Sequence, residues 1–280
     1  MKFAVSNIAW SPAERLAAYA ILKEHGFCGL EIAPGLFFAG DPDPFAPSEA
    51  SLRERVAEAE RFGLQLVSMQ SLFFGADQAA LFGDAAAVEL LSSRLSRAIG
   101  LAARLEIGNL VFGAPKQRVI PPDMAPEAVM TRLREVLLPL ADLATSQQVG
   151  IALEPNAAAY GTNFMTTFPE TLQVVAALNH PAITLNFDTG ALYMTDSFAE
   201  VASYVAQAGR LLSHTHISSA NLAPAPVSTA DAQAVLDALA AINYDRMVSI
   251  EMKAMPGDDL ATLTASIERL QAAAQQRGYL

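Results

Sequence analysis

The stretch Ile183-Thr184-Leu185-Asn186-Phe187-Asp188-Thr189-Gly190 decides how this chain folds. It is a run of strand length, rich in apolar and β-branched residues, that ends in a carboxylate and a turn. Three other runs of this kind end in Glu154, in His214-Thr215-His216 and in Glu251. Such runs are typical of strands buried on both faces of a parallel sheet. An ionisable residue at the end of such a strand costs desolvation energy unless it is paired or bound to a metal.

Similar short runs alternate with longer Ala- and Leu-rich segments of helical period along the whole chain, which is the pattern of repeated strand–helix units. The length of 280 residues is close to the ~250 residues of an eight-unit barrel. The rival architecture is an open doubly wound sheet, which usually has a glycine-rich loop after its first strand. Residues 7–12 follow the first strand here and contain no glycine. We therefore predict an α/β fold, a single-domain (β/α)8 TIM barrel over residues 1–280.

The predicted strands are Phe3–Ile8, Gly29–Ile32, Gln65–Met69, Leu110–Phe112, Gly150–Glu154, Ile183–Asp188, Leu212–Ile217 and Met247–Glu251. The first predicted helix begins at Pro12 and ends near Gly26. The other predicted helices cover about 48–62, 85–104, 126–148, 168–178, 198–208, 229–241 and 260–276.

The composition excludes several kinds of partner. The net charge is −11, and nucleic-acid affinity comes largely from Lys and Arg that neutralise phosphates, so nucleic acid and anionic membranes are disfavoured. No apolar run approaches the ~18 residues of a membrane span. Cys28 is the only cysteine, so no intramolecular disulfide can form, which fits a reducing compartment. We expect a cytoplasmic protein.

The four strand-end side chains form the candidate site. In a (β/α)8 barrel the carboxyl ends of the strands line the active site, so these residues are expected to converge on one rim. Carboxylates so close together need a compensating cation or raised pKa values. A set of carboxylate oxygens and one imidazole suits Mn²⁺, Mg²⁺, Co²⁺ or Zn²⁺. His214 and His216 lie on the same face of their strand, so spacing alone does not choose between them.

At these motifs the sequence resembles the sugar phosphate isomerase/epimerase family of the xylose-isomerase-like TIM-barrel superfamily. The resemblance covers essentially the whole chain, from Phe3-Ala4-Val5-Ser6-Asn7 and Gly29-Leu30-Glu31-Ile32 to Tyr244-Asp245 and Ser249-Ile250-Glu251-Met252. It implies that the second histidine of the His-x-His strand, His216, binds metal. It also implies that Glu154 and Glu251 bind metal and move the substrate proton. The implied metal set is therefore Glu154, Asp188, His216 and Glu251, with Mn²⁺ as the first candidate.

Three positions depart from the pattern of the ketose epimerases in that superfamily. A substrate-binding His, Glu and Arg of those enzymes are replaced here by Ala191, Gly161 and Leu222. The metal and proton-transfer residues are retained, while the side chains that clamp the sugar are not. A ketohexose 3-epimerase in the strict sense is therefore not expected.

The substrate pocket is expected to draw on strand ends and the residues just after them. Trp10 is the only tryptophan, and stacking on a sugar face and plain packing are both open for it. Glu31 could bond a substrate hydroxyl or pair with a cation such as Lys253. The candidate substrate-binding residues are Asn7, Trp10, Glu31, Gln70, Phe112, Asn156, His214 and Lys253.

The expected function is a divalent-metal-dependent isomerase or epimerase that moves a proton on a sugar-like keto or hydroxy compound through a metal-stabilised enediolate. A metal-dependent dehydratase or lyase on a keto-polyol is the alternative. A phosphodiesterase resembling endonuclease IV would need further His or Glu ligands on the second to fourth strands, and a non-catalytic sugar-binding barrel is also open. The expected partner is a small sugar-like substrate, with a homodimer or homotetramer as the assembly.

Overall fold

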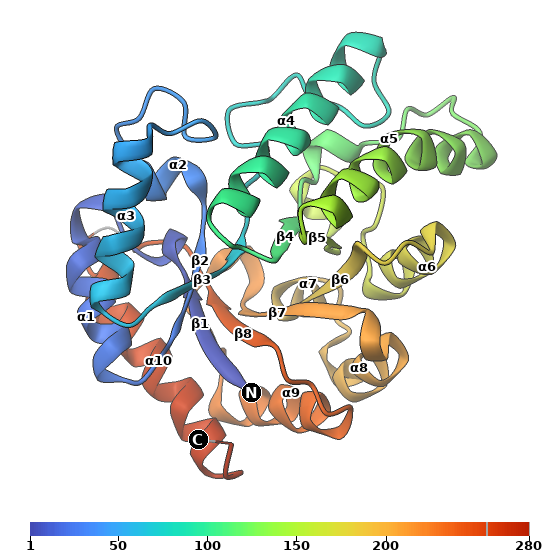
Figure 1. Cartoon of the computed structure of the whole chain (residues 1–280). Coiled ribbons are helices and arrows are strands. Elements are labelled where there is room, and N and C mark those ends of the chain that lie inside the picture. The colour runs from blue at the N-terminus through green and yellow to red at the C-terminus, as the bar shows by residue number, and fades with distance from the viewer. Residues whose placement is uncertain (256, 280) are drawn as a thin grey trace.

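The computed structural model describes residues 1–255 and 257–279. Eight parallel strands form a closed barrel in which each strand pairs with its neighbours in sequence and β8 pairs with β1. The predicted (β/α)8 barrel is confirmed, and the strands lie in the centre of the molecule (Figure 1). The strands are β1 Lys2–Ser6, β2 Gly29–Ile32, β3 Gln65–Met69, β4 Asn109–Phe112, β5 Gly150–Leu153, β6 Ile183–Asp188, β7 Leu212–Ser218 and β8 Met247–Glu251.

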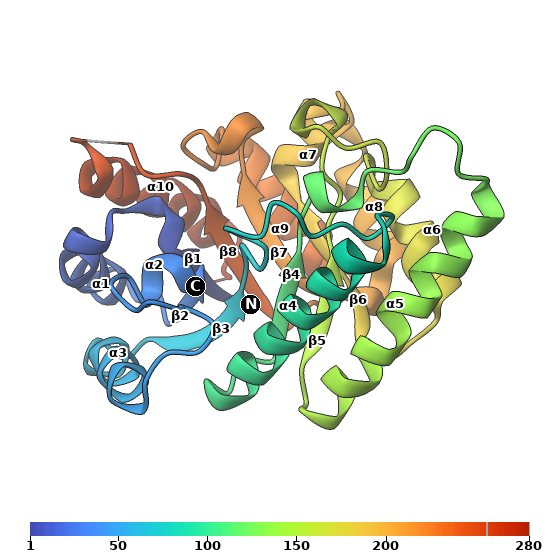
Figure 2. The same ribbon diagram turned by 90° about the horizontal axis from the view of Figure 1, so that it is seen from above.

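The helices surround the barrel, as Figure 2 shows from above. They are α1 Arg15–Glu24, α2 Pro34–Phe37, α3 Glu49–Arg61, α4 Ala85–Arg104, α5 Pro126–Ser146, α6 Phe168–Leu178, α7 Thr189–Met194, α8 Val201–Ala208, α9 Thr229–Ala241 and α10 Asp259–Gln275. The short helices α2 and α7 were not predicted, because a single turn does not show a helical period in the sequence. None of the described helices is both long and apolar enough to cross a membrane.

Side-chain caps fix where several helices begin. The hydroxyl of Ser48 accepts the backbone N–H of Ser51 at the start of α3, and Thr167 and Ser228 act in the same way at α6 and α9. Asp188 caps α7 by accepting the backbone N–H of Ala191 at 2.5 Å. These caps satisfy N–H groups that have no partner inside the helix, and the cap at Asp188 also fixes a predicted metal ligand.

The inside of the barrel is more polar than the strand sequences suggest. Hydroxyl and amide groups bond across it, with Asn109 donating to Ser68 at 3.0 Å and Ser213 donating to Asn109 at 2.8 Å. Thr184 and Ser213 are 2.7 Å apart at the same level. Because side chains alternate along a strand, the inward positions carry the polar groups while the outward positions pack against the helices.

Candidate metal and catalytic site

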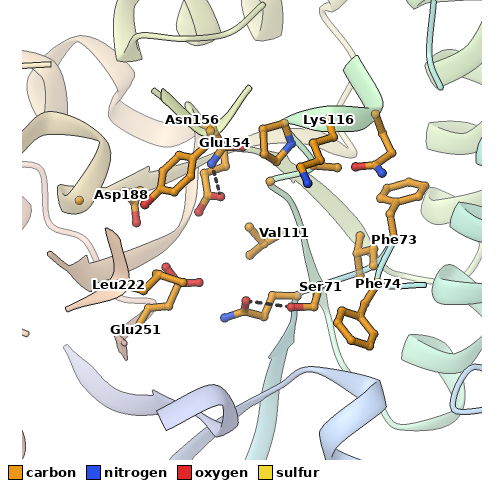
Figure 3. Close-up of a pocket in the computed structure, with 18 of the residues that line it drawn as sticks. Ser71, Phe73, Phe74, Val111, Lys116, Glu154, Asn156, Asp188, Leu222 and Glu251 are labelled. Carbon is orange, nitrogen blue, oxygen red and sulfur yellow. Dashed lines mark hydrogen bonds between the residues drawn. The ribbon is translucent and has the colours of Figure 1, made fainter. Parts of the chain in front are cut away.

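A cavity of about 550 Å³ lies at the carboxyl ends of the strands. Glu154, Asp188 and Glu251 line one side of it, as Figure 3 shows. Each side chain is at the end of its strand or one residue beyond, and each is at most 7% exposed. The three carboxylates, at the ends of β5, β6 and β8, therefore face the same space.

His216 lies at the bottom of this carboxylate group and has no exposed surface. Its Nδ1 atom is 3.0 Å from Glu154 Oε1, 3.3 Å from Glu251 Oε2 and 3.8 Å from Asp188 Oδ2. One ligand atom from each of the four residues lies within 4.8 Å of the others. This donor set of three carboxylate oxygens and one imidazole nitrogen fits a hard or borderline divalent cation.

Glu31 occupies a different place from the one predicted. It is fully buried beneath the cavity and lies 3.0 Å from Nε2 of His216. Its other oxygen accepts the Ser249 hydroxyl at 3.0 Å, and His214 Nε2 lies 3.3 Å from Oε1. Glu31 therefore does not line the substrate cavity. It holds the His216 ring so that Nδ1 faces the carboxylates, as outer carboxylates do for metal-binding histidines.

Burial and mutual charge set the protonation of the site. Burial, together with the charges of Glu154 and Glu251, raises the pKa of Asp188 to about 8. Burial alone would lower the pKa of His216, but Glu251 and Glu31 raise it well above its usual value. The pKa of Glu251 is raised by burial. Burial also acts to raise the pKa of Glu154, but the hydrogen bond and charge of His216, together with the hydrogen bonds from Asn156 and Asn186, lower it below its usual value. Such a cluster favours a bound cation, which removes the repulsion between carboxylates.

Glu154 is held by amides on both of its oxygens. Asn186 donates to Oε1 at 2.6 Å, and Asn156 donates to Oε2 at 3.0 Å. Gly113, just after β4, makes room for this carboxylate, since a Cβ atom there would lie 1.9 Å from Oε2. Only glycine lets the chain pass so close to the carboxylate.

Arg118 is a site residue that the sequence did not reveal. Its side chain is fully buried, and burial lowers its pKa to about 10. It donates to Asn156 Oδ1 at 3.0 Å and to the backbone oxygens of Phe164 at 3.0 Å and Met165 at 3.2 Å. Arg118 thus joins the loop after β4 to the loop after β5 and positions Asn156 against Glu154.

Two predicted substrate-binding residues, Gln70 and Asn156, line the cavity, and the others do not. Trp10 is 2% exposed and packs edge-on against Tyr19, with ring centroids 6.2 Å apart. Asn7 bonds the backbone of Ala33 with both ends of its amide. The side chains of Trp10 and Asn7 thus lie outside the cavity lining, where they pack and fix a loop.

The remaining predicted residues also differ from expectation. Phe112 is fully buried and packs behind Phe73, which does line the cavity. His214 is buried below the site beside Glu31. Lys253 is exposed and lies outside the cavity lining. Its expected ion pair with Glu31 is replaced by the contacts of Glu31 with the two histidines.

Several lining residues were missed because they lie in loops. Tyr160 lines the cavity near the carboxylates, and burial and the charge of Asp188 raise the pKa of its phenol. Phe73, Phe74 and Lys116 form the opposite side (Figure 3), and Gln117 is also part of the lining. Their positions depend on how the loops after β3 and β4 fold back over the barrel, and no strand pattern indicates that.

The positions that depart from the ketose epimerase pattern surround the carboxylate side. Leu222 lines the cavity with an apolar side chain. Ala191 is buried, and its backbone N–H donates to Asp188 in the cap of α7. Gly161 adopts a left-handed backbone with φ of 83° beside Tyr160. The wall near the carboxylates therefore offers a phenol and a leucine.

Residues 19–274 match the model of the xylose isomerase-like TIM barrel family, and the chain belongs to that family. A search of curated protein sequences gave no match.

Solved structures share the fold at low identity. A D-psicose 3-epimerase in the presence of D-fructose has a TM-score of 0.75 and 17% identity, over 99% of both chains. A 3-keto-D-glucoside 4-epimerase from E. coli has a TM-score of 0.75 and 19% identity, over 97% of this chain and 99% of the other. An L-ribulose 3-epimerase has a TM-score of 0.75 and 16% identity, over 99% and 97%.

Proposed function

We propose that this protein is a divalent-metal-dependent isomerase or epimerase that moves a proton on a sugar or sugar-derived keto or hydroxy compound. The observation that carries the proposal is the pair of carboxylates Glu154 and Glu251. Both line the cavity, and both lie within 3.3 Å of the same nitrogen of His216. The similar structures named above are sugar epimerases by their titles, which supports an isomerase class.

Glu154, Asp188, His216 and Glu251 would hold the metal through three carboxylates and one imidazole. A bound divalent ion would draw electron density from the oxygens of the substrate and so make the neighbouring C–H proton more acidic. Glu154 and Glu251 take and return that proton, each acting as base or acid according to the face of the substrate. Asn156 and Asn186 fix the orientation of Glu154, and Glu31 fixes that of His216.

Mn²⁺ is the first metal we propose, with Mg²⁺, Co²⁺ and Zn²⁺ as alternatives, because oxygen-rich sites with one imidazole accept all of them. We further propose a cytoplasmic enzyme with a small sugar-like substrate. A homodimer or homotetramer stays a prediction, which light scattering on the purified protein would measure.

The experiment strips metal with a chelator, adds back each ion separately, and follows solvent deuterium into a panel of keto sugars. We expect metal-dependent exchange on at least one sugar. Glu251→Gln and Glu154→Gln should each lower the exchange rate by at least about 100-fold, the lower range of a general acid–base contribution. Product analysis for loss of water separates epimerisation from dehydration.

The matched control is Glu89→Gln, which changes an exposed glutamate outside the cavity lining in the same way. It should keep the wild-type rate. Full exchange activity in Glu251→Gln, or the absence of exchange on every sugar with every metal, would refute the proposal.

A further inference from the structure

The cavity is larger than one sugar ring requires. Its volume of about 550 Å³ corresponds to roughly 18 waters at about 30 Å³ each, whereas a hexose has only roughly a dozen non-hydrogen atoms. The carboxylates occupy one side, and the loops after β3 and β4 form the other (Figure 3). A monosaccharide held at the carboxylates would leave this second part of the cavity free.

An aromatic wall faces the second part. Phe74 is 77% exposed although it is a large apolar side chain, and Phe73 lies beside it in the lining. The loop that carries them is held by Arg94, which donates to the backbone oxygens of Leu72 at 3.1 Å and Phe74 at 2.7 Å. An exposed aromatic ring on a fixed loop at a cavity is suited to stack against an apolar ligand face.

Polar groups of both signs complete this wall. Gln117 is 8% exposed and lines the cavity, and its side-chain amide bonds to no other residue in the described part of the chain. Lys116 points its ammonium group toward the cavity, and Asp77 adds a carboxylate to the lining. The amide atoms of Gln117 are not among the buried polar atoms that lack a partner, so they are accessible from the cavity. Gln117 therefore provides a donor and an acceptor for a hydroxylated group.

We propose that Phe73, Phe74, Asp77, Lys116 and Gln117 form a second subsite, which binds a neutral polyhydroxylated ring attached to the reacting sugar. The substrate is then a glycoside of a keto sugar rather than a free monosaccharide, an inference that rests on the proposed function. The aromatic rings contact the apolar face of the added ring, and the amide and charged groups bond its hydroxyls.

Charge decides against an anionic substituent in this subsite. Lys116 and Asp77 offset each other in the lining, and the whole chain carries a net charge of −11. A phosphate or carboxylate would gain little from one exposed lysine in a lining that also carries a carboxylate. A neutral ring can bond both the ammonium of Lys116 and the carboxylate of Asp77, because its hydroxyl groups accept as well as donate hydrogen bonds.

The test measures equilibrium binding of unreactive sugars to the full-length protein by calorimetry. The probes are D-glucose as the single ring, and maltose, cellobiose, sucrose and trehalose as rings joined through different linkages. We expect at least one disaccharide to bind about tenfold or more tightly than D-glucose. Phe74→Ala and Gln117→Ala should each weaken the binding of that disaccharide by roughly fivefold. Each should change the binding of D-glucose by less than about twofold.

Leu90→Ala is the control, since Leu90 is also an exposed apolar residue but lies outside the cavity. It should leave both ligands unaffected. The proposal is overturned if no disaccharide binds more tightly than D-glucose. It is also overturned if Phe74→Ala and Gln117→Ala weaken the binding of the disaccharide and of D-glucose equally. It is also overturned if fructose 6-phosphate binds more tightly than every disaccharide and Lys116→Gln removes that advantage.

The outcome is separable from that of the proposed function. Selective disaccharide binding that depends on Phe74, without deuterium exchange on any keto sugar, would keep the subsite and reject the isomerase. Exchange on free keto sugars, with no preference for disaccharides and no effect of Phe74→Ala, would keep the isomerase and reject the subsite.

Discussion

Glu31 connects the polar interior of the barrel to the candidate metal ligands. It carries its charge with no exposed surface because His216, His214 and Ser249 all contact it. The two histidines lower its pKa well below the usual range, although burial acts in the opposite direction. A charge at this depth is favourable only with such partners, so its role is to orient His216.

Replacing Glu31 by Gln should weaken metal binding about 10- to 100-fold, which is the usual effect of losing an outer carboxylate partner of a metal-bound histidine. Titration with Mn²⁺ followed by calorimetry measures the change. Ser249→Ala removes only a hydroxyl contact to Glu31, so it should lower the affinity for the metal by less than tenfold. Equal metal affinity in Glu31→Gln and the wild type would contradict the orienting role.

Residues at strand ends could be predicted, whereas residues in loops could not. Glu154, Asp188, His216 and Glu251 come together because the barrel places the ends of neighbouring strands on one rim. Lys116 and Gln117 are brought to the cavity by a loop whose course depends on buried Arg118. An isolated arginine in a polar loop sequence does not indicate burial, because most arginines are exposed.

At the scale of elements, Arg118 acts as the joint between the loops after β4 and β5. Arg118→Met keeps much of the apolar stem but removes the donors to four groups: the side chain of Asn156 and the backbone oxygens of Phe112, Phe164 and Met165. The backbone oxygens each keep another donor. The largest single loss is at Asn156 Oδ1, whose one donor is Arg118, and losing a hydrogen bond to a charged group costs ~1.5–3 kcal/mol. We expect the free energy of unfolding to fall by about 3 kcal/mol and turnover to fall with it.

Urea denaturation measures the stability change, and Arg134→Met is the matched control. Arg134 is exposed and donates to one backbone oxygen at 3.2 Å, so its replacement should cost less than about 0.5 kcal/mol. Arg118→Lys keeps the charge but lacks the planar fork, and should restore stability only in part. Equal stability of the Arg118→Met and Arg134→Met proteins would contradict the proposal that Arg118 holds the two loops together.

Helices α1 and α3 are tied together by one carboxylate. Glu58 accepts Arg15 at 2.9 Å through both of its oxygens, and Arg55 donates to it at 2.7 Å. The hydrogen bond from Arg15 and that from Arg55 lower the pKa of Glu58 to about 2, against the effect of burial. Because the folded-state pKa is below that of the unfolded chain, this stabilisation is complete above about pH 4.5 and is lost as the pH falls toward 2.

We therefore expect Glu58→Gln to reduce the free energy of unfolding by about 1–2 kcal/mol at pH 7. The difference from the wild type should shrink as the pH falls from about 5 to about 3. Urea midpoints at several pH values test this, with Glu60→Gln, an exposed position on the same helix, as the control. A difference that stays constant over that range would contradict the ion-pair origin.

The strand pattern predicted the elements well because parallel barrel strands are short and apolar between polar turns. The bounds of Gln65–Met69, Ile183–Asp188 and Met247–Glu251 agree with the structure to the residue. The short helix α7 was missed, because its start depends on the cap that Asp188 provides and not on a period. The polar layer inside the barrel was also missed, because inward Thr and Ser residues do not interrupt an apolar run.

For the whole molecule, metal binding and folding are expected to be coupled. The ligands come from β5, β6, β7 and β8, so unfolding of any of these strands separates them. Metal at about 100 times its dissociation constant should raise the free energy of unfolding by ~2.7 kcal/mol. Thermal unfolding with and without Mn²⁺ measures this, and Asp188→Asn should show a much smaller metal-dependent shift. No shift in the wild type would contradict a site built from all four strands.

The pairing of β1 with β8 joins Lys2 to Met247. During synthesis on the ribosome, β1 can pair with β2 early, but its other edge has no partner until β8, Met247–Glu251, has been made. The strand that closes the barrel also carries Glu251, the last of the candidate ligands. A nascent chain thus acquires its closed barrel and its complete ligand set in the same step, and a growing chain that lacks β8 should have little affinity for the metal.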